Sequence, residues 1–167
     1  MLVELMRTLF IALSIALTAC ATPGFAEEAH SESHNEPRPF ETDRDAQADV
    51  DAALERATER GTKALIVMGA NWCHDSRGLA TVFEMPETAQ LIADNYELVW
   101  VDVGFKVLNQ DVAKRFGLEG TPGTPTVIVA RADGTIMNLE DAPTWRNAYS
   151  RKPEDIHQYF VEMAARE

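Results

Sequence analysis

The chain has 167 residues, of which 46% are hydrophobic and 25% are charged. These values are typical of one globular domain, and they exclude a large multi-domain enzyme, a coiled-coil rod and a polytopic membrane protein. The formal net charge is -12, so the surface repels phosphate backbones and nucleic-acid binding is not expected. The two cysteines are too few for a disulfide-stapled scaffold or a four-cysteine zinc site.

Residues 1–26 are expected to be an export signal. Their apolar run, residues 9–19, is shorter than the roughly 20 residues that cross a membrane, and it fits the core of a secretory signal peptide. The run ends at residues 17–20 in LTAC, which resembles the lipobox of bacterial lipoproteins, where Cys20 would become a lipidated N-terminus. Ordinary cleavage after Ala26 is the alternative. Both predict a periplasmic protein, and the first also predicts a lipid anchor in the membrane.

The next residues, 27–44, are expected to be a disordered acidic tether. They contain no Leu, Ile, Val or Met and are rich in Glu and Asp, so they cannot bury enough apolar surface to offset the entropy of ordering. His30 and His34 could share a metal ion, but no third strong ligand is fixed beside them, and no metal is expected. The folded domain is therefore predicted to span residues 45–167.

Within that domain the spacing of apolar residues predicts alternating helices and strands. The predicted helices are 45–60, 74–84, 86–94, 109–116 and 153–165, and the predicted strands are 64–69, 97–103 and 126–130. Asp133-Gly134 predicts a hairpin turn, after which residues 135–139 are expected to pair back as an antiparallel strand. Residues 140–152 show no regular pattern. This order predicts an α/β fold, a mixed sheet flanked by helices on both faces.

Cys73 directly follows the buried strand 64–69 and opens a helix. Unpaired N–H groups at a helix start favour the thiolate, which is the reactive form of cysteine. Arg77 and a protonated His74 would favour the thiolate further, whereas Asp75 would oppose it. The alternative is an inert buried cysteine that packs as a small hydrophobe, and a strand-to-helix turn beside polar residues suits that role poorly.

From about residue 45 to residue 165 the chain resembles the thioredoxin superfamily. The resemblance rests on WCHDS at residues 72–76 and on GTPT at residues 123–126, before the strand 126–130. It implies that Cys73 is the thiol that attacks disulfides and that Pro125 is a cis-proline facing it. It also implies that the substrate groove is framed by Trp72, Thr124 and Pro125.

Two positions depart from the pattern of the superfamily. Ser76 stands where the second, resolving cysteine is expected, and Val67 stands where typical thioredoxins carry a buried Asp. The resemblance therefore implies half of a dithiol cycle, in which Cys73 attacks and an external thiol must complete the exchange. His74 and Ser76 are the other predicted catalytic residues, and Ser76 is expected to donate a hydrogen bond to the thiolate.

The sequence leaves three functions open. The first is a monothiol oxidoreductase whose partners are client proteins or small thiols and disulfides. The second is a redox-inactive binding or chaperone module, and the third is a sensor whose thiol is oxidised to sulfenic acid. A hydrolytic triad of Cys73, His74 and Asp75 is not expected, because triad members converge from distant segments. Metal binding by Cys73 and His74 lacks further ligands, and no cofactor is expected.

Overall fold

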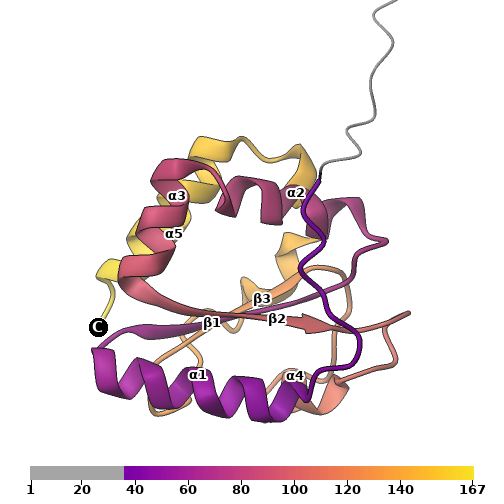
Figure 1. The fold of residues 1–167 in the computed structure, drawn as a ribbon, viewed down its shortest axis with the longest axis horizontal. Helices are drawn as coiled ribbons and strands as arrows, with labels where there is room; N and C mark the ends of the chain where they lie inside the picture. The colour runs from indigo at the N-terminus through magenta and orange to yellow at the C-terminus, as the bar shows by residue number, and fades with distance from the viewer. Residues whose placement is uncertain (1–35) are drawn as a thin grey trace, which may run out of the picture. The chain divides into compact units, whose positions relative to one another are not determined.

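The computed structural model describes residues 36–167 (Figure 1). The predicted signal segment, its Cys20, the histidines at 30 and 34 and the first half of the tether lie outside the described residues. The helices are α1 (Ala46–Arg60), α2 (His74–Phe83), α3 (Pro86–Asn95), α4 (Gln110–Arg115) and α5 (Pro153–Ala165), with short 3-10 helices η1 (Ala142–Trp145) and η2 (Ala148–Ser150). The strands are β1 (Lys63–Gly69), β2 (Tyr96–Asp102) and β3 (Thr126–Ala130).

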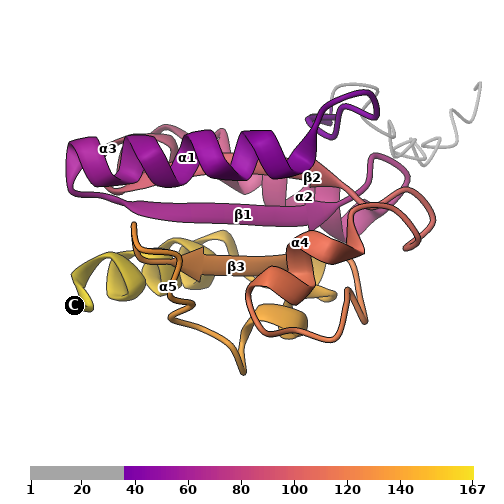
Figure 2. The same cartoon turned by 90° about the horizontal axis from the view of Figure 1, so that it is seen from below.

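The three strands form a mixed sheet in the order β2-β1-β3. β1 and β2 are parallel, with Gly69 opposite Asp102. β1 and β3 are antiparallel, with Met68 opposite Thr126. Figure 1 shows α1 and α4 on one face of the sheet and α2, α3 and α5 on the other. In Figure 2, which looks onto the side of α1 and α4, β1 and β3 point in opposite directions. The predicted α/β fold, with helices on both faces of a mixed sheet, is confirmed.

The central strand β1 divides its side chains between two apolar cores. Ala64, Ile66 and Met68 pack toward α1 and α4, whereas Leu65 and Val67 pack toward α2, α3 and α5. Each is fully buried, and burying one side chain of Val, Leu, Ile or Met contributes about 1.5–3 kcal/mol. Val67 is thus an ordinary core residue where typical thioredoxins carry an acid.

The predicted boundaries of the eight helices and strands above differ from the observed ones by no more than one residue. Local chemistry explains one clear case. Asp45 is the N-cap of α1 rather than its first residue, and its Oδ1 accepts a hydrogen bond from the amide of Ala48 at 3.1 Å. At the other end, Gly61 takes a left-handed conformation that ends the helix.

The predicted strand 135–139 is wrong. In this segment only Ile136 forms an antiparallel bridge, and its partner is Ala130. Farther along β3, the side chain of Asn138 makes the hydrogen bonds to the backbone of β3. Its Oδ1 accepts from the amide of Val129 at 2.8 Å, and its Nδ2 donates to the carbonyl of Val127 at 2.9 Å. A buried side-chain amide therefore satisfies the backbone groups that a second strand would have paired.

The predicted tether is wrong for its second half, residues 36–44, which belong to the folded domain. Phe40 is 1% exposed and packs edge-on against Trp100 at 5.2 Å. Asn71 fixes its backbone, because Asn71 Nδ2 donates to the carbonyl of Phe40 at 2.8 Å and Asn71 Oδ1 accepts from its amide at 3.2 Å. One aromatic side chain with matched backbone bonds orders a segment whose composition is otherwise that of a disordered chain.

The edge strand β2 is held against α1 by charged side chains. Buried Glu97 pairs with Arg56 at 2.8 Å and also with Arg60. Burial alone would raise the pKa of Glu97, but the hydrogen bonds from the two guanidinium groups bring it below its ordinary value. Glu97 is therefore ionised and fixes the start of β2 on the end of α1.

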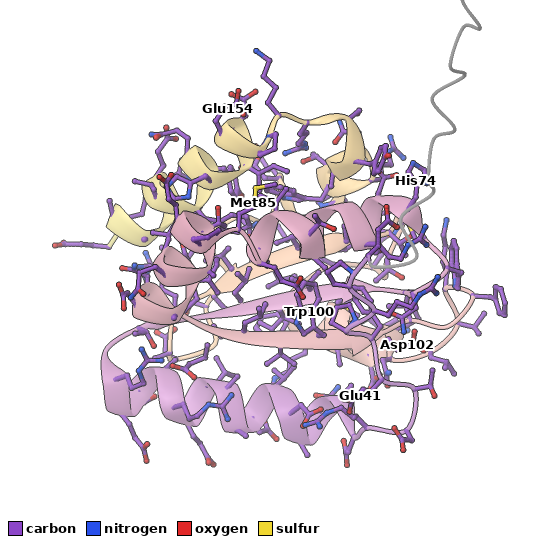
Figure 3. The ribbon with its side chains drawn as sticks, turned by 45° about the horizontal axis from the view of Figure 1, so that its top comes forward. Glu41, His74, Met85, Trp100, Asp102 and Glu154 are labelled. Atoms are coloured by element: carbon purple, nitrogen blue, oxygen red, sulfur yellow. The ribbon has the colours of Figure 1, made fainter. Side chains whose placement is uncertain are left out.

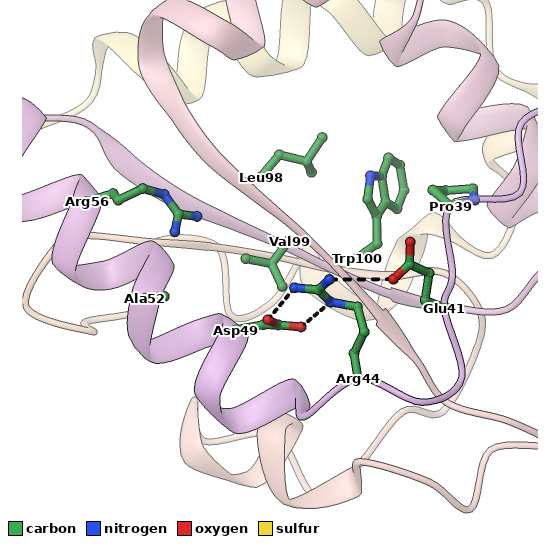
Figure 4. Close-up of a pocket in the computed structure, with 9 residues that line it drawn as sticks. All are labelled: Pro39, Glu41, Arg44, Asp49, Ala52, Arg56, Leu98, Val99 and Trp100. Carbon is green, nitrogen blue, oxygen red and sulfur yellow. Dashed lines mark hydrogen bonds and ion pairs between the residues drawn. The ribbon is translucent and has the colours of Figure 1, made fainter.

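A pocket of about 220 Å³ lies farther along the same edge, between α1 and β2 (Figure 4). Arg44 lies over it and donates two hydrogen bonds of 2.6 Å to Asp49, which lowers the pKa of Asp49. Arg44 also pairs with Glu41 at 3.4 Å. Arg44, Glu41 and Asp49 thus satisfy one another, and Arg56, which also lines this pocket, is paired with Glu97. None of the residues that line this pocket lines the pocket around Cys73.

Residues 140–152, for which the sequence predicts nothing, are anchored by Trp145. Its side chain is fully buried and stacks on Phe160 at 5.3 Å, with the guanidinium of Arg151 over its ring at 4.2 Å. Because Trp145 is fixed in this way, the next residues, Arg146 and Tyr149 among them, are held beside the start of α2.

Candidate active site

Cys73 lies at the turn between β1 and α2, where its backbone amide donates to the carbonyl of Ala70 at 3.0 Å. It is the N-cap of α2 and is 7% exposed. Its Sγ donates to the carbonyl of Thr124 at 3.3 Å, and the peptide bond between Thr124 and Pro125 is cis. The fold therefore brings Cys73, Thr124 and Pro125 together from two distant segments, as the resemblance implies.

Trp72 is half exposed beside the thiol and is fixed in orientation. Its Nε1 donates to the carbonyl of Gly104 at 2.8 Å, and its ring stacks on Phe105 at 5.9 Å with an interplanar angle of 12°. Phe105 is 82% exposed. The two rings form an apolar platform next to Cys73. Phe105 was missed in the sequence, although the apolar residues Phe105, Val107 and Leu108 in a predicted loop are a signal that could have pointed to it.

His74 and Asp75 attach the start of α2 to η2, and no hydrogen bond joins either side chain to the thiol within the described residues. Figure 3 shows His74 at the beginning of α2, where its ring meets Tyr149 edge-on at 5.2 Å. Its Nε2 lies 3.5 Å from Asp75 Oδ2, and Asp75 Oδ1 accepts from the amide of Tyr149 at 2.9 Å. Within residues 36–167 no hydrogen bond joins His74 to Cys73, and His74 lines the same pocket as the thiol.

Ser76 points into the domain, toward the end of β1. It is fully buried, and its Oγ accepts from the amide of Ala70 at 3.4 Å. A side chain added at Gly69 would place its Cβ 2.6 Å from this oxygen, so the end of β1 closes over Ser76. The expected hydrogen bond from Ser76 to the sulfur of Cys73 is not among the hydrogen bonds of the described residues.

Arg77 also differs from its expected role. Its Nε pairs with Glu36 Oε2 at 2.6 Å, and its Nη1 donates to the carbonyl of Asn71 at 3.0 Å. The charge that was expected to favour the thiolate is therefore compensated by Glu36. This acid lies in the segment that the sequence assigned to a disordered tether, which is why the pair was not foreseen.

A pocket of about 480 Å³ opens at the thiol. Its walls include Trp72, Cys73 and Thr124, and they also include two cations, Lys106 and Arg146, that sequence reasoning missed. No local motif marks these cations, because they come from loops that only the fold brings to the thiol. The site therefore combines a cysteine sulfur, an apolar platform, a cis-proline loop and positive charge.

The described part of the chain offers neither a metal site nor a membrane-spanning helix. Across residues 36–167 no three side chains of His, Cys, Asp or Glu come together as they would to bind a metal ion. No helix in this part of the chain is both long enough and apolar enough to cross a membrane.

A mixed sheet between two layers of helices, with a cysteine at the strand-to-helix turn facing a cis-proline loop, defines a thiol protein of the thioredoxin fold. The family model described as thioredoxin-like matches residues 45–132, and the chain belongs to this family. The chain is also similar to the crystal structure of a disulphide isomerase from Xylella fastidiosa Temecula1, with 28% sequence identity and a TM-score of 0.70. That match covers 76% of this chain and 97% of the other. No curated protein matches the chain.

Proposed function

We propose that the protein carries out thiol–disulfide exchange through Cys73 and depends on an external thiol to complete it. The observation that carries the proposal is the position of Sγ at the mouth of a pocket, against the carbonyl that precedes a cis-proline. Membership of the thioredoxin-like family and similarity to a protein described as a disulphide isomerase support it.

In the first step the Cys73 thiolate attacks one sulfur of a client disulfide. A bond forms between the two sulfurs, the original disulfide bond breaks, and the second client sulfur leaves as a thiolate that takes a proton from water. The client backbone would lie along Thr124 and Pro125, and its apolar side chains would pack on the platform of Trp72 and Phe105. The product is a mixed disulfide between Cys73 and the client.

The second step cannot be internal, because Ser76 occupies the place of a resolving thiol. A hydroxyl does not displace a thiolate from a disulfide, so release awaits a thiol from outside. Ser76→Cys is expected to supply an internal route, since the Cα atoms of residues three apart on a helix lie about 5 Å apart, within the Cα separation of roughly 4.4–6.8 Å that a disulfide bridges. The variant should release its client without added thiol, as followed on non-reducing gels.

Ser76→Ala is the matched control for this prediction. It removes the hydroxyl without adding a thiol, so it should capture clients and hold them as the unsubstituted protein does. If Ser76→Cys releases its client no faster than Ser76→Ala, then position 76 does not serve as the resolving position and the proposed division of the reaction is wrong.

A redox-inactive binding module is the second candidate, and it is favoured by the low exposure of Cys73 beside an exposed aromatic platform. In that case the pocket holds a partner by apolar and backbone contacts, and Sγ is a packing atom. The two candidates differ in the fate of Cys73→Ser, which would still bind its partner as a module but could not form a mixed disulfide.

We further propose that the protein is exported to the periplasm and anchored by a lipid on Cys20, on the basis of residues 1–26 alone. Mass spectrometry of the mature N-terminus in a bacterial host should find an acylated Cys20. A mature chain that begins at Glu27 would contradict the anchor and leave export in place.

A further inference from the structure

We infer that the external thiol that completes the exchange is an anionic low-molecular-weight thiol, bound through its carboxylates by Lys106 and Arg146. This inference rests on the proposed exchange at Cys73 and names the class of molecule that takes part in its second step. It is carried by the position of the two cations, by the absence of acidic partners for them within residues 36–167, and by the charge of the rest of the domain.

Arg146 is held against the loop that faces the sulfur. A Cβ added at Gly123 would lie 3.0 Å from Arg146 Cβ and 3.1 Å from its Cδ, so the aliphatic stem of Arg146 lies on Gly123. The next residue is Thr124, whose carbonyl accepts the hydrogen bond from Cys73 Sγ. Because Arg146 also follows the buried Trp145, both its backbone and its stem are fixed, and Arg146 is one of the residues that line the pocket around Cys73.

Lys106 reaches the same pocket from the loop between β2 and α4. The loop is ordered by two hydrogen bonds at its base, from the amide of Gly104 to Asp102 Oδ2 at 3.0 Å and from the amide of Leu108 to the carbonyl of Val103 at 3.2 Å. Trp72 Nε1 then ties the loop to the residue before the thiol through the carbonyl of Gly104. Lys106 therefore lies on a turn that is fixed relative to Cys73.

Arg77, another cation near the thiol, pairs with Glu36, whereas Lys106 and Arg146 form no ion pair or hydrogen bond with any residue from 36 to 167. Exposed cations elsewhere, such as Lys114 and Arg166, also form no ion pair with the described residues, and Lys106 and Arg146 differ from those two in lining the pocket of Cys73. The acid in the pocket wall, Asp75, is buried and accepts from the amide of Tyr149. In a chain of net charge -12, a pocket with two uncompensated cations attracts an anion to the sulfur.

The chemistry of the second step fits such a ligand. The thiolate of the anionic thiol attacks Sγ of Cys73 in the mixed disulfide, the bond to the client breaks, and the client leaves as a thiolate that takes a proton from water. Cys73 now carries the small thiol, and a second molecule attacks the sulfur of the first. The Cys73 thiolate leaves, and the two small thiols depart as their disulfide, oxidised by the two electrons that reduced the client.

The test uses the full chain with Cys20→Ser, which leaves Cys73 as the remaining thiol of the sequence. A mixed disulfide is formed between Cys73 and a neutral disulfide, oxidised mercaptoethanol, and its resolution is timed by mass spectrometry. Three thiols are compared: mercaptosuccinate, which is anionic, mercaptoethanol, which is neutral, and cysteamine, which is cationic. Each rate is measured with the unsubstituted pocket and with the variant Lys106→Gln/Arg146→Gln. For each thiol the rate in the variant is divided by the rate in the unsubstituted protein, and this ratio does not depend on the intrinsic reactivity of the thiol.

The double variant should slow resolution by mercaptosuccinate about fivefold, leave mercaptoethanol within about twofold and speed cysteamine. The matched control, Lys114→Gln/Arg166→Gln, removes the same charge from exposed residues outside the pocket wall and should leave all three rates unchanged. High salt should remove the advantage of mercaptosuccinate, since a screening length of about 3 Å at 1 M isolates exposed charges from one another.

Equal slowing of all three thiols by the pocket variant would contradict the inference, as would equal slowing of mercaptosuccinate by the control variant. Failure of Cys73 to form the first mixed disulfide would contradict the proposed exchange itself and the inference with it. The two failures are thus distinguished by the step at which they occur.

Discussion

Cys73→Ser is expected to abolish capture of every disulfide substrate. Serine keeps the size and the burial of the side chain, but its hydroxyl is a weak nucleophile at neutral pH and cannot form a disulfide. The helix start and the contact with the carbonyl of Thr124 tolerate this change, so the fold should remain. Mixed disulfides with a model peptide should be absent in the variant by mass spectrometry and present in the unsubstituted chain.

Cys20→Ser is the control for that experiment, because it removes the other cysteine of the sequence and should leave capture intact. The comparison also separates the two proposed functions. If Cys73→Ser keeps its partners and its normal role in cells, then exchange is not what the site does, and the binding module replaces it.

Phe40→Ala is expected to cost about 3–5 kcal/mol in the free energy of unfolding, as deletion of a buried aromatic side chain does. Phe40 is 1% exposed, packs on Trp100 and lies so close to Gly69 that an added Cβ there would be 2.7 Å from its ring. A loss of this size is a large share of the 5–15 kcal/mol that stabilises a typical domain. Urea unfolding measures it directly.

Phe105→Ala is the matched control, since it deletes the same side chain at a position that is 82% exposed. Its effect on unfolding should stay within about 0.5 kcal/mol. Equal effects of the two substitutions would mean that residues 36–44 are not part of the folded domain in solution.

The sequence was sufficient to predict the elements that local patterns encode. The continuous apolar run of β1 and the spacing of buried residues in α1 and α5 repeat with the periods of their backbones, so the order of helices and strands could be derived from them. Part of the site could be located for a similar reason, because Cys73 follows a buried strand and opens a helix. Pro125 was placed opposite Cys73 only by the resemblance to the thioredoxin superfamily.

The features that the sequence did not reveal depend on single contacts between distant residues. Asn138 replaces a strand because its side-chain amide matches the spacing of two groups on β3, which no pattern of hydrophobicity records. Phe40 orders its segment through Asn71, and composition averaged over the segment conceals one such residue. Arg146 lines the pocket of the thiol beside the buried Trp145, which no local motif indicates.

The orientation of side chains within the motif was also beyond the sequence. Ser76 lies one helical turn after Cys73, and its position alone did not indicate whether its oxygen meets the sulfur or the end of β1. The amide of Ala70 settles the question, because it donates to Ser76 Oγ inside the domain. Similarly, Arg77 turns toward Glu36, an acid that the sequence placed in a disordered segment.

The lifetime of the mixed disulfide at Cys73 tests the central claim most directly. The full chain with Cys20→Ser is allowed to capture a model peptide whose single cysteine is disulfide-bonded to mercaptoethanol. The released mercaptoethanol is removed, so that no thiol of the client remains in the adduct, and the adduct is followed by mass spectrometry with and without added thiol. We expect the adduct to persist for about minutes to hours without thiol, as uncatalysed disulfide rearrangement does, and to decay in proportion to the concentration of thiol added. An adduct that decays equally fast without thiol would contradict the account, because Cys73 would then be released by a group within the protein itself.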